Sequence, residues 1–167
     1  MTIVVITTII GPMKSPAKQE SCGAVANEDR LFVAILKSAD SLSQEAEHLI
    51  KSHNLTMAQY NVLRILRGAE PQGLLCRGIS ERMISRDPDM TRLLDRMEMR
   101  GLITRERQKD DRRVIVTRIT GEGLAFLKKL DQPVRELHKR QFAHMKSGRM
   151  KALAELLEEV VMRESSA

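Results

Sequence analysis

The sequence predicts a mainly α-helical protein that carries one small β-hairpin. Aromatic residues make up only 2% of the 167 residues, so the core must be built from Leu, Ile, Val and Met. Such a core favours helices packed on helices over a large sheet. Several stretches also repeat apolar residues at helical spacing, and two β-branched segments flank the polar turn KDDRR, which is typical of a hairpin.

Residues 1–26 are predicted to form a flexible N-terminal tail. The apolar start MTIVVITTII is too short to span a bilayer and lacks the basic start and cleavage site of a signal peptide. Residues 11–26 mix Gly, Pro, Ser and Lys without periodicity, as linkers do. The two cysteines, Cys22 and Cys76, stand in no metal-ligand or CxxC spacing. We therefore expect a cytoplasmic protein that does not associate with a membrane.

A long helix is predicted over residues 27–54. Asn27 is placed to cap it, with Glu28 and Asp29 in the first turn, where negative charge suits the helix dipole. Its apolar residues follow gaps of three and four, which gives one heptad-like face for dimerisation: Phe32, Ile35, Ala39, Leu42, Ala46 and Leu49.

Residues 55–120 are predicted to hold three short helices and a hairpin. Thr56 caps the first of these helices, which ends in the turn at residues 70–73. The next begins near Gly78, and the third follows Asp87-Pro88 as N-cap and first helical residue and ends near Arg100, before Gly101. The expected inward residues are Met57, Tyr60, Leu63, Leu66, Ile79, Met83, Ile84, Met90, Leu93, Leu94 and Met97.

The hairpin strands are expected at residues 102–108 and 114–120. Residues 121–167 are expected to form two C-terminal dimerisation helices. Thr120 is placed to cap the first of the two, and a break at residues 147–148 separates the second. Apolar residues again follow helical spacing in both, at Leu127, Leu130, Val134 and Leu137, and at Leu153, Leu156, Leu157, Val160 and Val161. These stripes and that of residues 27–54 exceed what one small domain can cover, which predicts a dimer interface with Ile35, Leu42, Leu153, Leu156, Leu157 and Val160.

The net charge of +6 lies entirely after residue 76, with eleven Lys/Arg against eight Asp/Glu in residues 77–113 and ten against seven in residues 114–167. A basic surplus attracts polyanions such as nucleic acid. Arg92, Arg96 and Arg100 also lie four residues apart, on one face of the predicted helix. Pairing with Asp95 and Glu98 on a solvated surface is the alternative interpretation of this stripe.

The order of helix, capped helix with an arginine stripe, Gly stop, strand, charged loop and strand is typical of a winged helix-turn-helix. Residues 55–123 resemble the MarR family of transcriptional regulators. The resemblance lies in Leu55-Thr56 with Gln59, in TRLLDRMEMRGLITR at 91–105, in Asp111-Arg112-Arg113, and in Thr120 with Gly123. It implies a DNA-binding regulator, expected to be a ligand-responsive repressor, that binds an inverted-repeat operator as a homodimer.

The resemblance also implies DNA contacts. It places base contacts at the start of the helix that enters the major groove, at Asp89, Met90, Thr91 and Arg92. The arginine stripe adds Arg96 to the expected DNA contacts. It places Arg113, beside Arg112, in the minor groove at the tip of the wing, and Asp111 as the residue that orients the wing. The sequence departs from many relatives in starting this helix with Asp87-Pro88-Asp89 instead of Ser or Thr, so that Asp89 is placed to accept a bond from a cytosine amino group.

Three alternatives remain open at this point. An enzyme has no support, because the chain has no nucleophile elbow, P-loop, dinucleotide fingerprint or metal-ligand cluster, and we expect neither a cofactor nor a metal. A winged helix that binds a protein instead of DNA would not need the arginines. A thiol-based redox sensor would use Cys76, which is followed by Arg77 and a helix start. We expect instead a small organic effector between the dimerisation helices and the winged domain.

Overall fold

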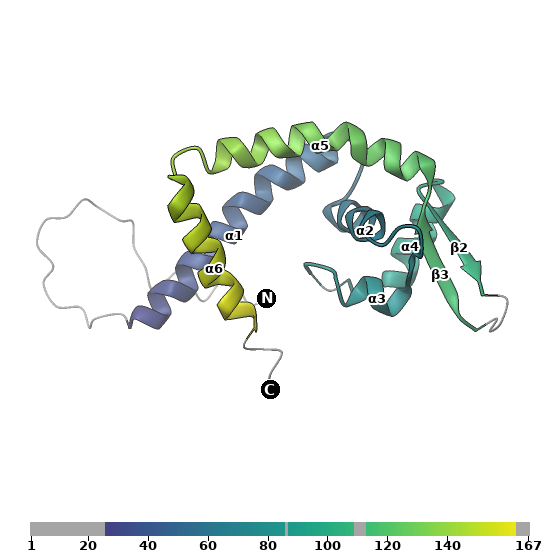
Figure 1. Ribbon diagram of the computed structural model, residues 1–167, viewed down its shortest axis with the longest axis horizontal. Coiled ribbons are helices and arrows are strands. Elements are labelled where there is room, and N and C mark those ends of the chain that lie inside the picture. The colour runs from purple at the N-terminus through teal and green to yellow at the C-terminus, as the bar shows by residue number, and fades with distance from the viewer. Residues whose placement is uncertain (1–25, 86, 109–112, 163–167) are drawn as a thin grey trace, which may run out of the picture. The chain divides into compact units, whose positions relative to one another are not determined.

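The computed structural model describes residues 26–85, 87–108 and 113–162, which form six helices and a three-stranded sheet (Figure 1). The chain divides into two compact units, residues 1–37 and residues 38–167. The elements are α1 (Asn27–Ser52), α2 (Met57–Arg67), β1 (Leu74–Leu75), α3 (Cys76–Ser80), α4 (Met90–Met99), β2 (Ile103–Arg107), β3 (Ile115–Ile119), α5 (Gly121–Gln141) and α6 (Ser147–Met162). The predicted fold class, mainly α with a small β wing, is confirmed.

The first unit contains the beginning of α1. The helix starts at Asn27 itself, and Ala26, not Asn27, is the residue whose carbonyl accepts the first helical bond, from the Arg30 N–H at 3.1 Å. Leu31, Phe32 and Leu36 are exposed in this segment.

The second unit holds one hydrophobic core, built from the helices α2, α3, α4 and α5, the end of α1 and the sheet. Thr56 and Gln59 form a reciprocal capping box at the start of α2. Residues predicted to point inward from α2 and α4 are indeed buried or half-buried. The most deeply buried side chains are Ile50, Val62, Leu63, Leu66, Ile79, Leu93, Leu94, Met97, Leu102, Ile103, Leu127 and Leu130.

The sheet has the strand order β1-β3-β2 and is antiparallel throughout. Ile103 pairs with Ile119 at one end of the hairpin, and Arg107 pairs with Ile115 at the other. The short strand β1 was not predicted from the sequence, because two residues are too few to show an alternation. It pairs Leu74 with Thr117 and adds a third strand to the wing.

Besides the cap at Asn27, two details of the sequence prediction are wrong. The helix α3 begins at Cys76 and ends at Ser80, so Ile84 lies beyond it and is 88% exposed instead of buried. The N-cap of α4 is Asp89, two residues later than Asp87. The α5 stripe is buried within its own subunit, chiefly against α2: Leu127, Leu130, Val134 and Leu137. A dimerisation role for residues 121–141 stays a prediction.

Candidate nucleic-acid interface

Helix α4 has one buried apolar face and one exposed polar face. Met90, Leu93, Leu94 and Met97 are buried in the core. The residues between them, Thr91, Arg92 and Arg96, are exposed. Because the buried face fixes the rotation of α4 about its axis, the polar face points to solvent in a defined direction. Of the predicted contacts on this helix, Met90 is buried, and its side chain is the least accessible to a ligand.

The start of α4 is held by two aspartates in sequence. The Asp87 carboxylate accepts a hydrogen bond from the Asp89 N–H at 2.9 Å, and the Asp89 carboxylate accepts from the Arg92 N–H at 3.2 Å. Asp89 also forms an ion pair with the Arg92 side chain, at 3.1 Å. The predicted base contact of Asp89 therefore competes with its capping role. Arg92 would have to leave its ion pair with Asp89 in order to contact DNA.

The predicted arginine stripe divides into two functions. Arg100 donates to the Asn54 carbonyl oxygen at 2.9 Å and to the Gln59 side-chain oxygen at 3.2 Å, so it ties the end of α4 to the loop before α2. The Arg96 side chain, in contrast, has no hydrogen bond or ion pair with any residue that the structure describes. Arg96 is thus the exposed cation of α4 that is available to a phosphate.

The acidic residues of α4 bind an arginine of the wing that the sequence analysis did not single out. Arg105 of β2 donates to Glu98 at 2.6 Å and 2.8 Å, and also to Asp95. The Glu98 hydrogen bond raises the pKa of Arg105 although partial burial opposes it. This pattern excludes the alternative in which Asp95 and Glu98 neutralise Arg92 and Arg96. A clue was present in the sequence: Arg105 faces the core side of a strand, where a cation needs a partner.

The tip of the wing falls mostly outside the described residues. Asp111 and Arg112 belong to the segment 109–112, so the predictions made for them lie outside the structure's description. Arg113 follows this segment and is exposed. The Gln108 N–H donates to the Val114 carbonyl at 2.9 Å and is the last ladder bond on the described side of the tip.

The junction between wing and α5 explains the Thr120 and Gly123 pattern. The Thr120 hydroxyl accepts from the Gly123 N–H at 3.0 Å and donates to the Gly101 carbonyl at 2.7 Å. Gly101 adopts a φ of +69°, which favours glycine. A side chain at Gly123 would bring its Cβ within 2.3 Å of the Leu102 carbonyl oxygen. This junction therefore requires these residue types for its own packing.

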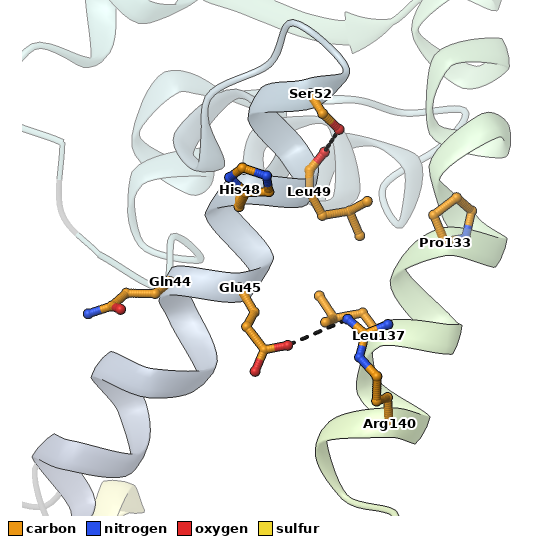
Figure 2. A pocket seen from close by; sticks show the side chains of 8 residues that line it. All are labelled: Gln44, Glu45, His48, Leu49, Ser52, Pro133, Leu137 and Arg140. Atoms are coloured by element: carbon orange, nitrogen blue, oxygen red, sulfur yellow. Dashed lines mark hydrogen bonds and ion pairs between the residues drawn. The ribbon is translucent and has the colours of Figure 1, made fainter.

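A cleft of about 490 Å³ lies between the second half of α1 and α5 (Figure 2). Its apolar residues are Leu49, Pro133 and Leu137, and its polar residues are Gln44, Glu45, His48, Ser52 and Arg140. Arg140 and Glu45 form an ion pair at 3.5 Å across it. We call this space the α1–α5 cleft.

The described part of the chain contains neither a cluster of metal-ligating side chains nor a membrane-spanning helix. Residues 26–85, 87–108 and 113–162 contain no group of three or more His, Cys, Asp or Glu side chains that is placed to hold a metal ion. Within the same ranges, the structure contains no helix that is long and apolar enough to cross a membrane. Cys76 is exposed at the start of α3.

The helices α2 to α4 with the hairpin β2–β3 define a winged helix-turn-helix, in which α4 occupies the position of the helix that enters the major groove. The comparisons with known proteins agree with this class. The MarR family model matches residues 55–115. The crystal structure of a MarR transcription factor from Planctomyces limnophilus is 33% identical and covers 82% of this chain and 98% of its own, with a TM-score of 0.62.

Two curated relatives are named as a repressor and as a transcriptional regulator. The homoprotocatechuate degradative operon repressor of Escherichia coli is 29% identical over 133 residues, which are 80% of this chain and 88% of the repressor. The organic hydroperoxide resistance transcriptional regulator of Bacillus subtilis is 31% identical over 101 residues, 60% of this chain and 67% of the regulator. The chain belongs to the MarR family and is a DNA-binding transcriptional regulator.

Proposed function

We propose that the protein is a homodimeric repressor that binds an inverted-repeat operator and leaves it when a small organic molecule binds. The proposal rests on the two faces of α4: its apolar face is buried, while Thr91, Arg92 and Arg96 are exposed on the other face. In a two-fold dimer, two such helices enter successive major grooves roughly 34–36 Å apart. Arg113 at the wing, beside Arg112, would reach the adjacent minor groove, and Asp111 would orient the wing.

The dimer is supported by the apolar surface of α6. All residues of this helix with a described side chain are exposed or half-buried, including Leu153, Leu156, Leu157, Val160 and Val161. A continuous exposed apolar face marks an interaction site. On α1, Leu42 is half-buried and Ile35 likewise, so a second subunit would complete the burial of both. We therefore propose residues 27–54 and 121–167 as dimerisation elements, around a DNA-binding domain of residues 55–120.

We propose the α1–α5 cleft as the binding site of the effector. Its mixture of apolar walls with His48, Gln44 and Arg140 suits a small molecule that has an apolar body and a polar or acidic group. The name of the Escherichia coli relative links that protein to the breakdown of an aromatic acid, homoprotocatechuate. By analogy, we propose aromatic acids or phenols as the effector class here. The effector acts as a switch if its binding free energy differs by only a few kcal/mol between the DNA-bound and the DNA-free protein.

The proposal is tested with the purified protein and its own promoter region in a footprinting and gel-shift experiment. We expect a protected inverted repeat and an affinity that falls as salt rises, since phosphate contacts release counterions. Arg96→Ala should weaken binding at every salt concentration and flatten the salt dependence. Lys128→Ala, which removes the same charge from an exposed position on α5, should do neither. A protein that binds no fragment of the promoter, or equal losses in both variants, would contradict the proposal.

A further inference from the structure

Two aspartates occupy the end of α4 at which a helix attracts anions. The first N–H groups of a helix lack helical acceptors and the helix dipole is positive there, so this end can bind a phosphate. In this chain Asp89 Oδ1 accepts from the Arg92 N–H at 3.2 Å, and the Asp89 N–H donates to the Asp87 carboxylate at 2.9 Å. An internal carboxylate therefore takes the place that a DNA phosphate could otherwise take.

The same carboxylate engages the first arginine of the exposed face of α4. The second oxygen of Asp89, Oδ2, lies 3.1 Å from Arg92 Nε. Arg96 lies four residues further along the same face and is exposed, with no ion pair among the residues that the structure describes. Of these two arginines, Arg96 is the one without a counter-charge.

The position of Asp89 gives this pair its consequence for DNA binding. An exposed ion pair contributes little to stability by itself. The capping hydrogen bonds, however, fix the Asp89 carboxylate at the start of α4. If Arg92 turned to a phosphate, this carboxylate would stay behind without its counter-charge, close to the negative DNA backbone. Because like charges in an interface disfavour binding, the gain from the phosphate contact would be largely offset.

Base edges can satisfy both members of the Asp89–Arg92 pair. In the major groove, a C·G base pair presents the cytosine amino group as a donor beside the guanine O6 and N7 acceptors. Asp89 would accept from the amino group while Arg92 donates to guanine, so that each charged side chain exchanges the other for a base. A T·A pair in the same place presents the acceptor O4 of thymine to the carboxylate instead.

We propose that Asp89 is a specificity-determining residue, which withholds Arg92 from phosphates and releases it to guanine where a cytosine amino group satisfies the carboxylate. The inference rests on the proposed operator contacts of α4. It assigns general affinity for DNA to Arg96 and discrimination between operator and other DNA to the Asp89–Arg92 pair. Discrimination of this kind comes from a group that penalises the wrong partner as well as from contacts with the right one.

The experiment compares two labelled duplexes of equal length by fluorescence anisotropy: the promoter fragment that footprinting identifies and a scrambled sequence. Asp89→Asn removes the charge but keeps an oxygen that can cap the helix. It should tighten binding to the scrambled duplex about threefold or more and steepen the salt dependence by about one phosphate contact per subunit, with no matching gain on the operator. Glu136→Gln, which frees Lys139 on α5 in the same way, should change neither affinity.

Operator substitutions test the base contact. Replacing C·G by T·A at each position of both half-sites should weaken wild-type binding about fivefold or more at the position that Asp89 reads. Asp89→Asn should lose less at that position than the wild type does. An equal loss in both proteins at every position would overturn the base-reading half of the proposal.

A second background shows whether Asp89 acts through Arg92. In the Asp89→Asn, Arg92→Gln double variant, the gain on the scrambled duplex should disappear, because no guanidinium group is left to release. The proposal is overturned if Asp89→Asn binds the scrambled duplex as the wild type does, if Glu136→Gln shows the same gain, or if the gain persists without Arg92. Thermal unfolding checks that each variant is folded. A wild type that binds no promoter fragment would contradict the proposed function instead, whereas the withholding of Arg92 is measured on the scrambled duplex alone.

Discussion

Arg105 of β2 lies 2.6 Å from Glu98 of α4, and the same guanidinium group also binds Asp95. The two carboxylates stand three residues apart on the helix, so one side chain of the wing holds nearly a full turn of α4. The arrangement joins the two elements that are expected to contact DNA. Their relative orientation therefore depends on a side chain that need not touch DNA itself.

We predict that Arg105 and Glu98 are energetically coupled. In a double-mutant cycle of Arg105→Ala and Glu98→Ala, the unfolding free energies should show a coupling of about 0.5–2 kcal/mol, reduced from a buried-pair value because Glu98 remains partly exposed. Urea unfolding measures it. The control cycle combines Arg107→Ala with Glu98→Ala. Arg107 is an exposed arginine of the same strand, so the two effects on the unfolding free energy should be additive. Additivity in the first cycle would show that the pair contributes nothing to stability.

The operator contacts give a second prediction. Arg92→Ala and Arg113→Ala should each weaken operator binding by about 1–3 kcal/mol if these side chains read bases. Their loss should depend on operator sequence, whereas the loss in Arg96→Ala should be nearly uniform, because a phosphate contact carries no sequence information. Fluorescence anisotropy at fixed salt with wild-type and base-substituted operators separates the two. Wild-type affinity in both Arg92→Ala and Arg113→Ala would refute the assignment.

The junction between the wing and α5 offers a prediction with an internal control. Gly123→Ala should destabilise the protein by about 1–3 kcal/mol, because the new Cβ would collide with the Leu102 backbone. Gly121→Ala, two residues earlier in the same helix, meets no atom within 4 Å and should be neutral or slightly stabilising. Thermal unfolding compares them directly. Equal melting temperatures for the two variants would mean that the junction relaxes without cost.

Most of the fold followed from the sequence because local rules and packing agree in it. Thr56 and Thr120 cap their helices as predicted, and the apolar stripes of α2, α4 and α5 are buried. One error arose where two residues of the same type compete. Asp87 and Asp89 both suit an N-cap, and only the path of the chain before α4 decides between them. Similarly, the α5 stripe alone does not tell whether the core of its own subunit or a partner covers it.

The candidate site was less predictable, because it depends on pairs that are distant in sequence. The spacing of Arg92, Arg96 and Arg100 indicates one face, yet Arg100 is drawn away by Asn54 and Gln59. The α1–α5 cleft likewise forms between helices whose separation no local pattern encodes. Periodicity can place a side chain on a face, but the partner on the opposite element is known only from the tertiary structure.

Assembly is tested on α6. The double substitution of Leu153 and Leu157 by Glu puts two charges on its apolar face and should convert the proposed dimer to a monomer, because the charges would be buried against the partner. Removal of residues 150–167 should likewise yield monomers or aggregates. Lys151→Glu, on an exposed part of the same helix, is the control and should remain dimeric. Sedimentation velocity measures all three, and a dimeric truncated protein would show that the interface lies elsewhere.

The last prediction separates a small organic effector from thiol oxidation. Cys76 is exposed and therefore accessible to an oxidant, and one curated relative is named for organic hydroperoxide resistance. A sensing thiol must also be held as thiolate and, to form a disulfide, needs a second cysteine within reach. The neighbouring Arg77 is engaged by Glu81 at 2.7 Å, which diverts its charge from Cys76. The only other cysteine in the sequence is Cys22.

We therefore expect the Cys22→Ser, Cys76→Ser double variant to be released from the operator by aromatic acids or phenols as the wild type is, and peroxide to release neither. Operator release in a gel-shift titration measures both responses. If peroxide releases the wild type and spares the double variant, the thiol is the sensor and the effector assignment is wrong.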